Sequence, residues 1–272
     1  LALLTAKTLG KCNNAHIKFA TVIEFIHTAT LLHDDVVDLS QLRRGKPTAN
    51  AQFGNSPSVL VGDFLYTRAF QLMVEIGNMQ LLKIMANSTN IIAEGEVLQL
   101  EKSGDPSTSE SQYLDIIYRK TATLFSSASF GAAILSQSDS HELTAMSNFG
   151  RYLGLAFQIT DDILDYSGNA QEMGKHLGDD LAEGRMTLPL IRVMETGNSK
   201  DTSLISNAIS EKDRTAFGAV LDSIYANRAI EYCEKLALKY RDLATAEIDF
   251  LKASEAKEGL HKLCQISVDR LT

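Results

Sequence analysis

Apolar residues recur along this chain at the three- and four-residue spacing of helices, and no convincing two-residue strand pattern appears. The spacing predicts a sequence of long helices, over 14–38, 58–76, 79–102, 110–136 and 140–167, with roughly four or five more after Thr187. Two spans rich in glycine or in polar residues, 40–58 and 167–185, are predicted loops. The expected fold class is therefore all-α, a single domain of ten or more helices over 1–272.

Three aspartates, Asp34, Asp35 and Asp38, end the first long helix, directly after an apolar run from Ala20 to Leu32. On a helix Asp34 and Asp38 stand one turn apart on the same face. An oxygen-only ligand set of this kind suits a hard cation, with Mg²⁺ as the first choice. A solvent-exposed helix end that carries acidic side chains without a metal explains one such cluster equally well.

A second acidic cluster, Asp161, Asp162 and Asp165, repeats the same spacing at the end of another apolar helix. Two such clusters are hard to explain as accidents of surface charge. If the two helices face each other across one cavity, their carboxylates can hold several divalent ions. Such ions would bind a diphosphate from both sides.

Basic residues lie where a diphosphate would need them. Arg43 and Arg44 follow the first cluster closely, and Lys120 and Lys175 flank the second. The planar fork of arginine donates two parallel hydrogen bonds to phosphate, and lysine acts as a point charge. Any one of these side chains alone would be read as a solvated surface cation, but their placement around two aspartate clusters favours a diphosphate site.

Composition excludes several classes of protein. The net charge of −8, with no block of like charge, gives no electrostatic support for binding nucleic acid. The cysteines, Cys12, Cys233 and Cys264, are few and widely spaced, which fits a reducing compartment and excludes a cysteine-based zinc site. Since there is neither a signal peptide nor an uninterrupted apolar run of about 20 residues, a soluble cytoplasmic protein without a transmembrane helix is expected.

A larger set of motifs appears in order along nearly the whole chain. They are EFIHTATLLHDDVVD, RRGKPTAN, SVLVGDFLYTRAF, EGEVLQL, YRKTA, FQITDDILD and GKHLGDDLAEGRMTLP. In this ordered set the chain resembles the trans-polyprenyl diphosphate synthase family, and within it most of all the bacterial enzymes that make octaprenyl diphosphate. A single DDxxD motif would be weak support, whereas the ordered set is specific.

The resemblance implies an isoprenoid-synthase-type helical bundle around a deep central cavity, usually assembled as a homodimer. It implies two or three Mg²⁺ ions per site, bound by Asp34, Asp38 and Asp161. Asp35, Asp162 and Asp165 would lie beside these ligands and complete the metal-binding set.

The resemblance also implies two substrate sites. Allylic diphosphate would be held by residues in both halves of the chain, namely Arg43, Lys120, Thr121, Gln158 and Lys175. His27 and Arg44 would hold isopentenyl diphosphate. Lys120, Gln158 and Asp161 are the expected catalytic residues, acting on the departing diphosphate.

Two departures from the family pattern stand out. The Gly-Lys-Arg-x-Arg-Pro segment that supplies two cations to the isopentenyl diphosphate site should precede LALLTAKTLG, so an N-terminally incomplete version of the protein is expected. The usual lysine of the EGK segment is Arg185 here, which keeps the charge and the substrate-binding role but changes the geometry.

The reaction expected from the resemblance is repeated addition of isopentenyl diphosphate to an allylic diphosphate, with farnesyl diphosphate as the expected primer. Ala29 and Thr30 are small where short-chain synthases carry aromatic plugs, so a product of about C40 for a quinone side chain is expected, within C35 to C50. Further down, the pocket would be lined by apolar residues for which ordinary core packing is an equally good account, namely Val22, Ile23, Ile26, Met73 and Met85. A transient membrane contact would serve release of so apolar a product.

Three other interpretations remain. A class I terpene cyclase would pair one aspartate motif with an Asn/Ser/Glu motif and an aromatic pocket, whereas here the second motif is a full DDILD and tryptophan is absent. A non-catalytic subunit of a heteromeric prenyltransferase would be expected to have lost one aspartate motif. A helical scaffold with acidic ends leaves the basic residues unexplained.

Overall fold

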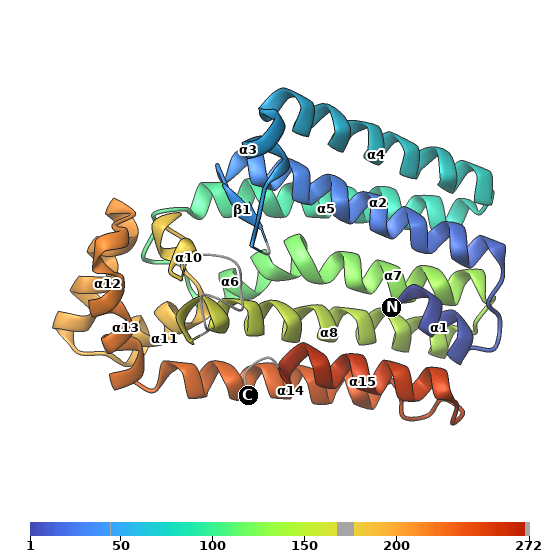
Figure 1. The fold of residues 1–272 in the computed structure, drawn as a ribbon. Coiled ribbons are helices and arrows are strands. Elements are labelled where there is room, and N and C mark those ends of the chain that lie inside the picture. Colours follow the sequence, from blue (N-terminus) through green and yellow to red (C-terminus); the bar gives the residue numbers. More distant parts are fainter. Residues whose placement is uncertain (44, 168–176, 270–272) are drawn as a thin grey trace.

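The computed structural model describes residues 1–43, 45–167 and 177–269, and within these ranges the chain is almost entirely helical (Figure 1). The first half contains α1 (Ala2–Thr8), α2 (Asn14–Val37), β1 (Leu42–Arg43), β2 (Lys46–Pro47), α3 (Ala49–Phe53), α4 (Asn55–Ile76), α5 (Met79–Lys102), α6 (Glu110–Ile117), a π-helical turn η1 (Tyr118–Ala122) and α7 (Thr123–Leu135). The second half contains α8 (Ser140–Ser167), α10 (Asp179–Ala182), α11 (Leu188–Thr196), α12 (Ser199–Glu211), a 3-10 turn η2 (Arg214–Ala216), α13 (Phe217–Ala226), α14 (Ala229–Ile248) and α15 (Glu255–Asp269).

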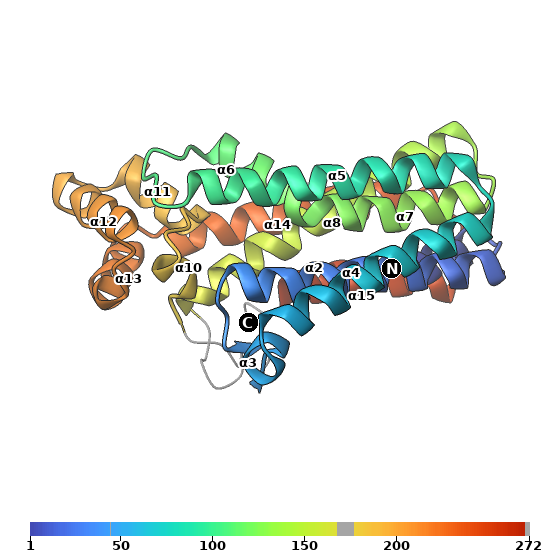
Figure 2. The same cartoon turned by 90° about the horizontal axis from the view of Figure 1, so that it is seen from above.

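The long helices run roughly along one axis and lie in layers. In Figure 1, α2, α4 and α5 form the upper part of the molecule, α7 and α8 the middle, and α14 and α15 the lower part. Helix α8 contacts both α7 and α14, and α2 packs along α4. The short helices α10 to α13 gather at one end, as the view from above also shows (Figure 2). The all-α prediction is confirmed.

Three predicted helices have nearly the expected bounds. Helices α2, α5 and α8 begin and end within one residue of the ranges predicted from apolar spacing. Local capping explains two of the starts, because the side chain of Asn13 accepts hydrogen bonds from the first turn of α2 and Asn78 does the same for α5.

Three predicted segments need correction. In the described part of the predicted loop 167–185, the short helix α10 forms over Asp179–Ala182. The span 40–58 is not a plain loop, since it contains the β1–β2 hairpin and α3, which the Thr48 side chain caps by accepting a hydrogen bond from the Ala51 amide. Helix α4 begins within it, at Asn55. The helix predicted over 110–136 is interrupted by the π turn η1, where the Thr123 hydroxyl donates to the carbonyl of Tyr118 at 2.9 Å.

Buried apolar side chains fill the space between the layers. One cluster surrounds Ile159 and Ile163 of α8, and a second, between α2, α4, α5 and α7, contains Phe19, Met73 and Met85. This second group is called the α2 core below. Among the described residues, no helix combines the length and the apolar character needed to cross a membrane.

Candidate active site

Each aspartate of the first cluster pairs with a different basic residue. The ion pairs are Lys120 Nζ–Asp34 Oδ2 at 3.7 Å, Arg43 Nη2–Asp35 Oδ1 at 2.7 Å and Arg185 Nη2–Asp38 Oδ2 at 2.7 Å. Asp35 is buried, with 4% of its surface exposed, and Arg43 binds it through two nitrogens. The side chains of Asp34 and Asp38 stay 18% and 19% exposed. The structure thus separates Asp35, which is bound within the protein, from two carboxylates that solvent can reach.

Lys120 is positioned by the π turn. Its ammonium donates to Glu96 Oε2 at 2.7 Å and to Gln99 Oε1 at 2.8 Å, both on α5. The turn fits only because glycines face it on two sides. A Cβ on Gly95 would lie 2.9 Å from the Lys120 amide nitrogen, and one on Gly154 would lie 2.5 Å from the Cα of Ala122.

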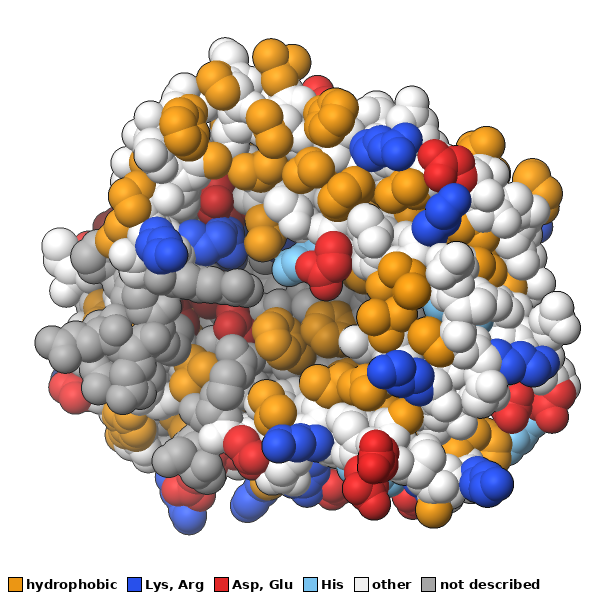
Figure 3. Space-filling view, turned by 45° about the vertical axis from the view of Figure 1, so that its right-hand side comes forward, with side chains coloured by type: hydrophobic (Ala, Val, Ile, Leu, Met, Phe, Trp, Pro, Cys, Tyr) orange, Lys and Arg blue, Asp and Glu red, His pale blue; other side chains and the backbone are white. Residues whose placement is uncertain are grey.

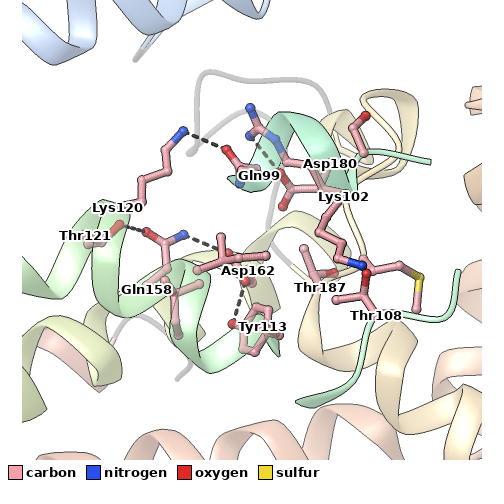
Figure 4. Close-up of a pocket in the computed structure, with 15 residues that line it drawn as sticks. Gln99, Lys102, Thr108, Tyr113, Lys120, Thr121, Gln158, Asp162, Asp180 and Thr187 are labelled. Atoms are coloured by element: carbon pink, nitrogen blue, oxygen red, sulfur yellow. Dashed lines mark hydrogen bonds and ion pairs between the residues drawn. The ribbon is translucent and has the colours of Figure 1, made fainter. Parts of the chain in front are cut away.

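A chain of hydrogen bonds begins beside Lys120 (Figure 4). The Thr121 hydroxyl donates to Gln158 Oε1 at 2.8 Å, and Gln158 Nε2 donates to Asp162 Oδ1 at 2.8 Å. The other oxygen of Asp162 accepts from the hydroxyl of Tyr113 at 2.6 Å. Residues predicted separately from two motifs therefore contact one another directly.

Arg185 connects the two aspartate clusters. Besides Asp38, it binds Asp180 Oδ1 at 3.3 Å and Glu183 Oε2 at 2.7 Å. The backbone amide of Asp180 donates to Asp165 Oδ2 at 3.2 Å. The ends of α2 and α8 are thereby joined through one partly buried arginine.

The carboxylates of this region are crowded, and several of them are largely shielded from water. Burial, with Asp180 nearby, raises the pKa of Asp162 and that of Asp165 to about 8. Burial likewise raises the pKa of Asp34 and of Glu96 above their usual range. Such a concentration of oxygen ligands is stabilised by a divalent cation, and the donor set fits Mg²⁺.

Within the described part of the chain, no three acidic, histidine or cysteine side chains converge closely enough to hold an ion alone. A bound Mg²⁺ would therefore take further ligands from water or phosphate, as Mg²⁺ commonly does in proteins. The residues present fit an ion that arrives together with a diphosphate.

The remaining predicted residues differ in their exposure. On α2, His27 is exposed, and Ile23 and Thr30 are partly buried on the same face as Asp34. Asp161 on α8 is partly buried. The others expected along the product cavity are buried, namely Val22, Ile26, Ala29, Met73 and Met85. Arg44 and Lys175 lie outside the described residues.

One pocket collects many of these side chains. It is lined by five of the predicted residues, Lys120, Thr121, Gln158, Asp162 and Arg185. The pocket continues between apolar side chains that include Ile116, Ile117 and Met186. In the space-filling view, acidic and basic side chains lie together in a hollow of the surface (Figure 3).

Four further residues of the site were not singled out from the sequence, namely Glu96, Gln99, Tyr113 and Asp180. Glu96 and Gln99 stand one turn apart in EGEVLQL, and this polar pair on one face of the helix was an available signal. Asp180 lies in a quoted motif, but nothing in its spacing indicates contact with Arg185. Tyr113 carries no signal in the sequence, because aromatic residues on helices are most often core.

Comparisons with known proteins agree with this geometry. The sequence profile of the polyprenyl synthetase family matches residues 1–226. The chain is 49% identical to an octaprenyl diphosphate synthase of Haemophilus influenzae, over 99% of this chain and 82% of that protein. It is 44% identical to an all-trans-nonaprenyl-diphosphate synthase of Rhodobacter capsulatus, over 100% of this chain and 83% of that protein.

Among solved structures, a polyprenyl synthase from Caulobacter crescentus, complexed with calcium and isoprenyl diphosphate, is similar in both sequence and fold. It superposes with a TM-score of 0.95 at 42% identity, over 100% of this chain and 83% of that one.

Proposed function

We propose a specific reaction for this chain, which belongs to the polyprenyl synthetase family and is a prenyltransferase. The proposed reaction extends farnesyl diphosphate with isopentenyl diphosphate until the product has about 40 carbon atoms. The octaprenyl diphosphate formed would supply a quinone side chain. The observation that carries the proposal is the single pocket in which Lys120, Thr121, Gln158 and Arg185 meet. The 49% identity to an octaprenyl diphosphate synthase supports the product length.

The allylic diphosphate binds at this pocket. Lys120 supplies a positive charge, and Thr121 and Gln158 supply a hydroxyl and an amide from the neighbouring side. Arg43 stands beside the same helix end through its contact with Asp35, and Lys175 completes the set. His27 and Arg44 bind isopentenyl diphosphate, which places the second substrate along α2.

Asp34, Asp38 and Asp161 would bind two or three Mg²⁺ ions directly, and Asp165 would lie next to them. The similar Caulobacter structure, which is complexed with calcium and isoprenyl diphosphate, supports the binding of a divalent cation together with a diphosphate. When bound, Mg²⁺ supplies Lewis-acid chemistry that draws charge from the diphosphate.

The chain's own residues act on the leaving group. Lys120 and Gln158 hold the diphosphate as the allylic C–O bond breaks and the electron pair leaves with the oxygen. The double bond of isopentenyl diphosphate then attacks the allylic carbon, and the resulting cation loses a proton to the released diphosphate. No side-chain nucleophile is needed, because catalysis consists of positioning and charge stabilisation.

The length of the product is set by the depth of the cavity that runs along α2, on the N-terminal side of Asp34. The growing chain follows α2 toward Phe19, a length of about 22 Å at 1.5 Å per residue. Ala29 and Thr30 leave the entrance open, and Ile23 and Ile26 line the next turns. Met73 and Met85, which belong to the α2 core, limit the depth.

A homodimer is supported by exposed apolar side chains on α4 and α5. Leu60, Phe64 and Val74 of α4 are each more than 60% exposed, as is Val97 of α5. Apolar side chains cover the upper part of the molecule, where α4 lies (Figures 1 and 3). Light scattering should give twice the chain mass for the protein and one chain mass for Phe64→Asp. Free cysteines, as in a reducing compartment, support a cytoplasmic location.

The decisive experiment incubates the protein with farnesyl diphosphate, labelled isopentenyl diphosphate and Mg²⁺, followed by chromatography of the products. The expected result is a linear product of about C40. A cyclic hydrocarbon would instead indicate a terpene cyclase. Activity that requires a different partner chain would indicate a subunit of a heteromeric prenyltransferase.

A further inference from the structure

Both carboxyl oxygens of Asp162 accept hydrogen bonds from side chains of the protein. Tyr113 donates to Oδ2 at 2.6 Å and Gln158 donates to Oδ1 at 2.8 Å. The residue is buried, with 5% of its surface exposed. A buried carboxylate held by donors on both oxygens differs from Asp34, whose nearest cation lies 3.7 Å away.

The contact with Asp162 determines how the Gln158 amide is oriented. Gln158 Nε2 donates to Asp162 Oδ1, so the NH₂ group of the amide faces the carboxyl group. The oxygen of the same amide then faces Thr121, whose hydroxyl donates to it at 2.8 Å. Asp162 therefore decides which end of the amide reaches Thr121, beside Lys120.

Tyr113 in turn holds Asp162. It comes from α6, 49 residues away along the chain, and only 3% of its surface is exposed. Figure 4 shows its hydroxyl pointing at Asp162 from below, whereas Gln158 approaches Asp162 from the left. If this hydroxyl is removed, a buried acceptor loses a hydrogen-bond partner that water cannot readily replace, which is costly.

We propose that Tyr113 and Asp162 are positioning residues that act through Gln158 and Thr121 on the allylic diphosphate, and that Asp162 is not a metal ligand. The inference rests on the proposed function, since it concerns the binding of that substrate. It predicts that changes at Tyr113 weaken diphosphate binding and leave the requirement for Mg²⁺ unchanged.

The test compares Tyr113→Phe with Tyr232→Phe. Tyr232 is a matched control, because its hydroxyl donates at 2.7 Å to Glu110, a carboxylate on the same helix α6, outside the pocket. Binding of inorganic pyrophosphate in the presence of Mg²⁺ is measured by calorimetry. We expect about tenfold weaker binding in Tyr113→Phe, as for the loss of one partner of a buried hydrogen bond, and unchanged binding in Tyr232→Phe. Equal affinities in the two variants would overturn the inference.

Steady-state kinetics supply the second measurement. The KM for farnesyl diphosphate should rise about tenfold in Tyr113→Phe, while the KM for isopentenyl diphosphate stays constant. At saturating substrates, the Mg²⁺ concentration for half-maximal rate should be unchanged in both Tyr113→Phe and Asp162→Asn. An Asp162→Asn variant that regains full activity with excess Mg²⁺ would identify Asp162 as a metal ligand and overturn the inference.

A double variant tests whether Tyr113 acts through Gln158. Once Gln158→Ala has removed the amide, adding Tyr113→Phe should weaken pyrophosphate binding no further. Additive losses would show that Tyr113 acts independently of Gln158. If wild-type protein binds pyrophosphate but forms no prenyl product, the proposed function fails, whereas equal binding by wild type and Tyr113→Phe counts against this inference alone.

Discussion

The pocket around Lys120 and the α2 core are stabilised in opposite ways. In the pocket, charged atoms from distant segments meet in ion pairs, such as Arg185 with Asp38 at 2.7 Å. In the α2 core, uncharged apolar side chains are held together by close packing. A Cβ on Gly131 would lie 2.3 Å from the ring of Phe19 and 2.8 Å from Leu81.

The difference separates two properties of the enzyme. Charge placement in the pocket governs how fast the diphosphate leaves, because stabilisation of the leaving group depends on a few oriented charges. Shape in the α2 core governs stability and how long the product grows, because a close-packed interior responds to single methyl groups. Substitutions in the two regions should therefore have different signatures.

The largest effect is expected for Asp34→Asn. Loss of one direct metal ligand should lower kcat/KM by about 1000-fold, the upper range for removal of one electrostatic group. Asp242→Asn, on an exposed position of α14, is the control and should leave kcat/KM unchanged. A loss of less than tenfold in Asp34→Asn would contradict the assignment of Asp34 as a metal ligand.

Lys120→Met should cost about 100-fold in kcat/KM, because the uncharged side chain cannot stabilise the departing diphosphate. Lys18→Met is a suitable comparison, since Lys18 also pairs with a glutamate, Glu75, at 3.0 Å, but on the surface. It should leave the initial rate of prenyl transfer unchanged. Similar losses of kcat/KM in both variants would show that an ion pair on the surface contributes as much to catalysis as the one in the pocket, and would contradict the role of Lys120.

Two glycine-to-alanine substitutions sharpen the comparison directly. Gly95→Ala presses on the backbone of Lys120 and should reduce kcat/KM by about tenfold through displacement of the ammonium. Gly131→Ala presses on Phe19 and should lower the free energy of unfolding by about 1–3 kcal/mol, while kcat/KM changes little. Chemical denaturation and initial rates are measured on both variants. If both variants lost the same stability and the same kcat/KM, the separation between the pocket and the α2 core would be refuted.

The smallest effect on rate is expected at the entrance to the product cavity. Thr30→Tyr and Ala29→Phe should both shorten the product, as measured by chromatography of labelled chains. Since Ala29 is buried, with 1% exposure, and Thr30 is partly exposed, only Ala29→Phe should also destabilise the fold. Unchanged product length in both variants would contradict the cavity along α2.

The sequence by itself determined the helices and the two aspartate clusters. The spacing of apolar residues predicted α2, α5 and α8 nearly to the residue, because each buries one continuous face and two start at a capping asparagine. The same spacing put Asp34 and Asp38 on one face. These are local properties, set within a few turns of helix.

Only the tertiary structure decided which helix faces meet. Periodicity says that Glu96 and Gln99 share a face of α5 but not that Lys120 lies against it. The π turn that directs Lys120 there depends on glycines of two other helices. Likewise, Asp35, Asp162 and Asp34 look alike in sequence, yet Arg43 binds the first, Tyr113 and Gln158 hold the second, and the third stays accessible. The chemical role of a carboxylate depends on neighbours that the chain brings from far away.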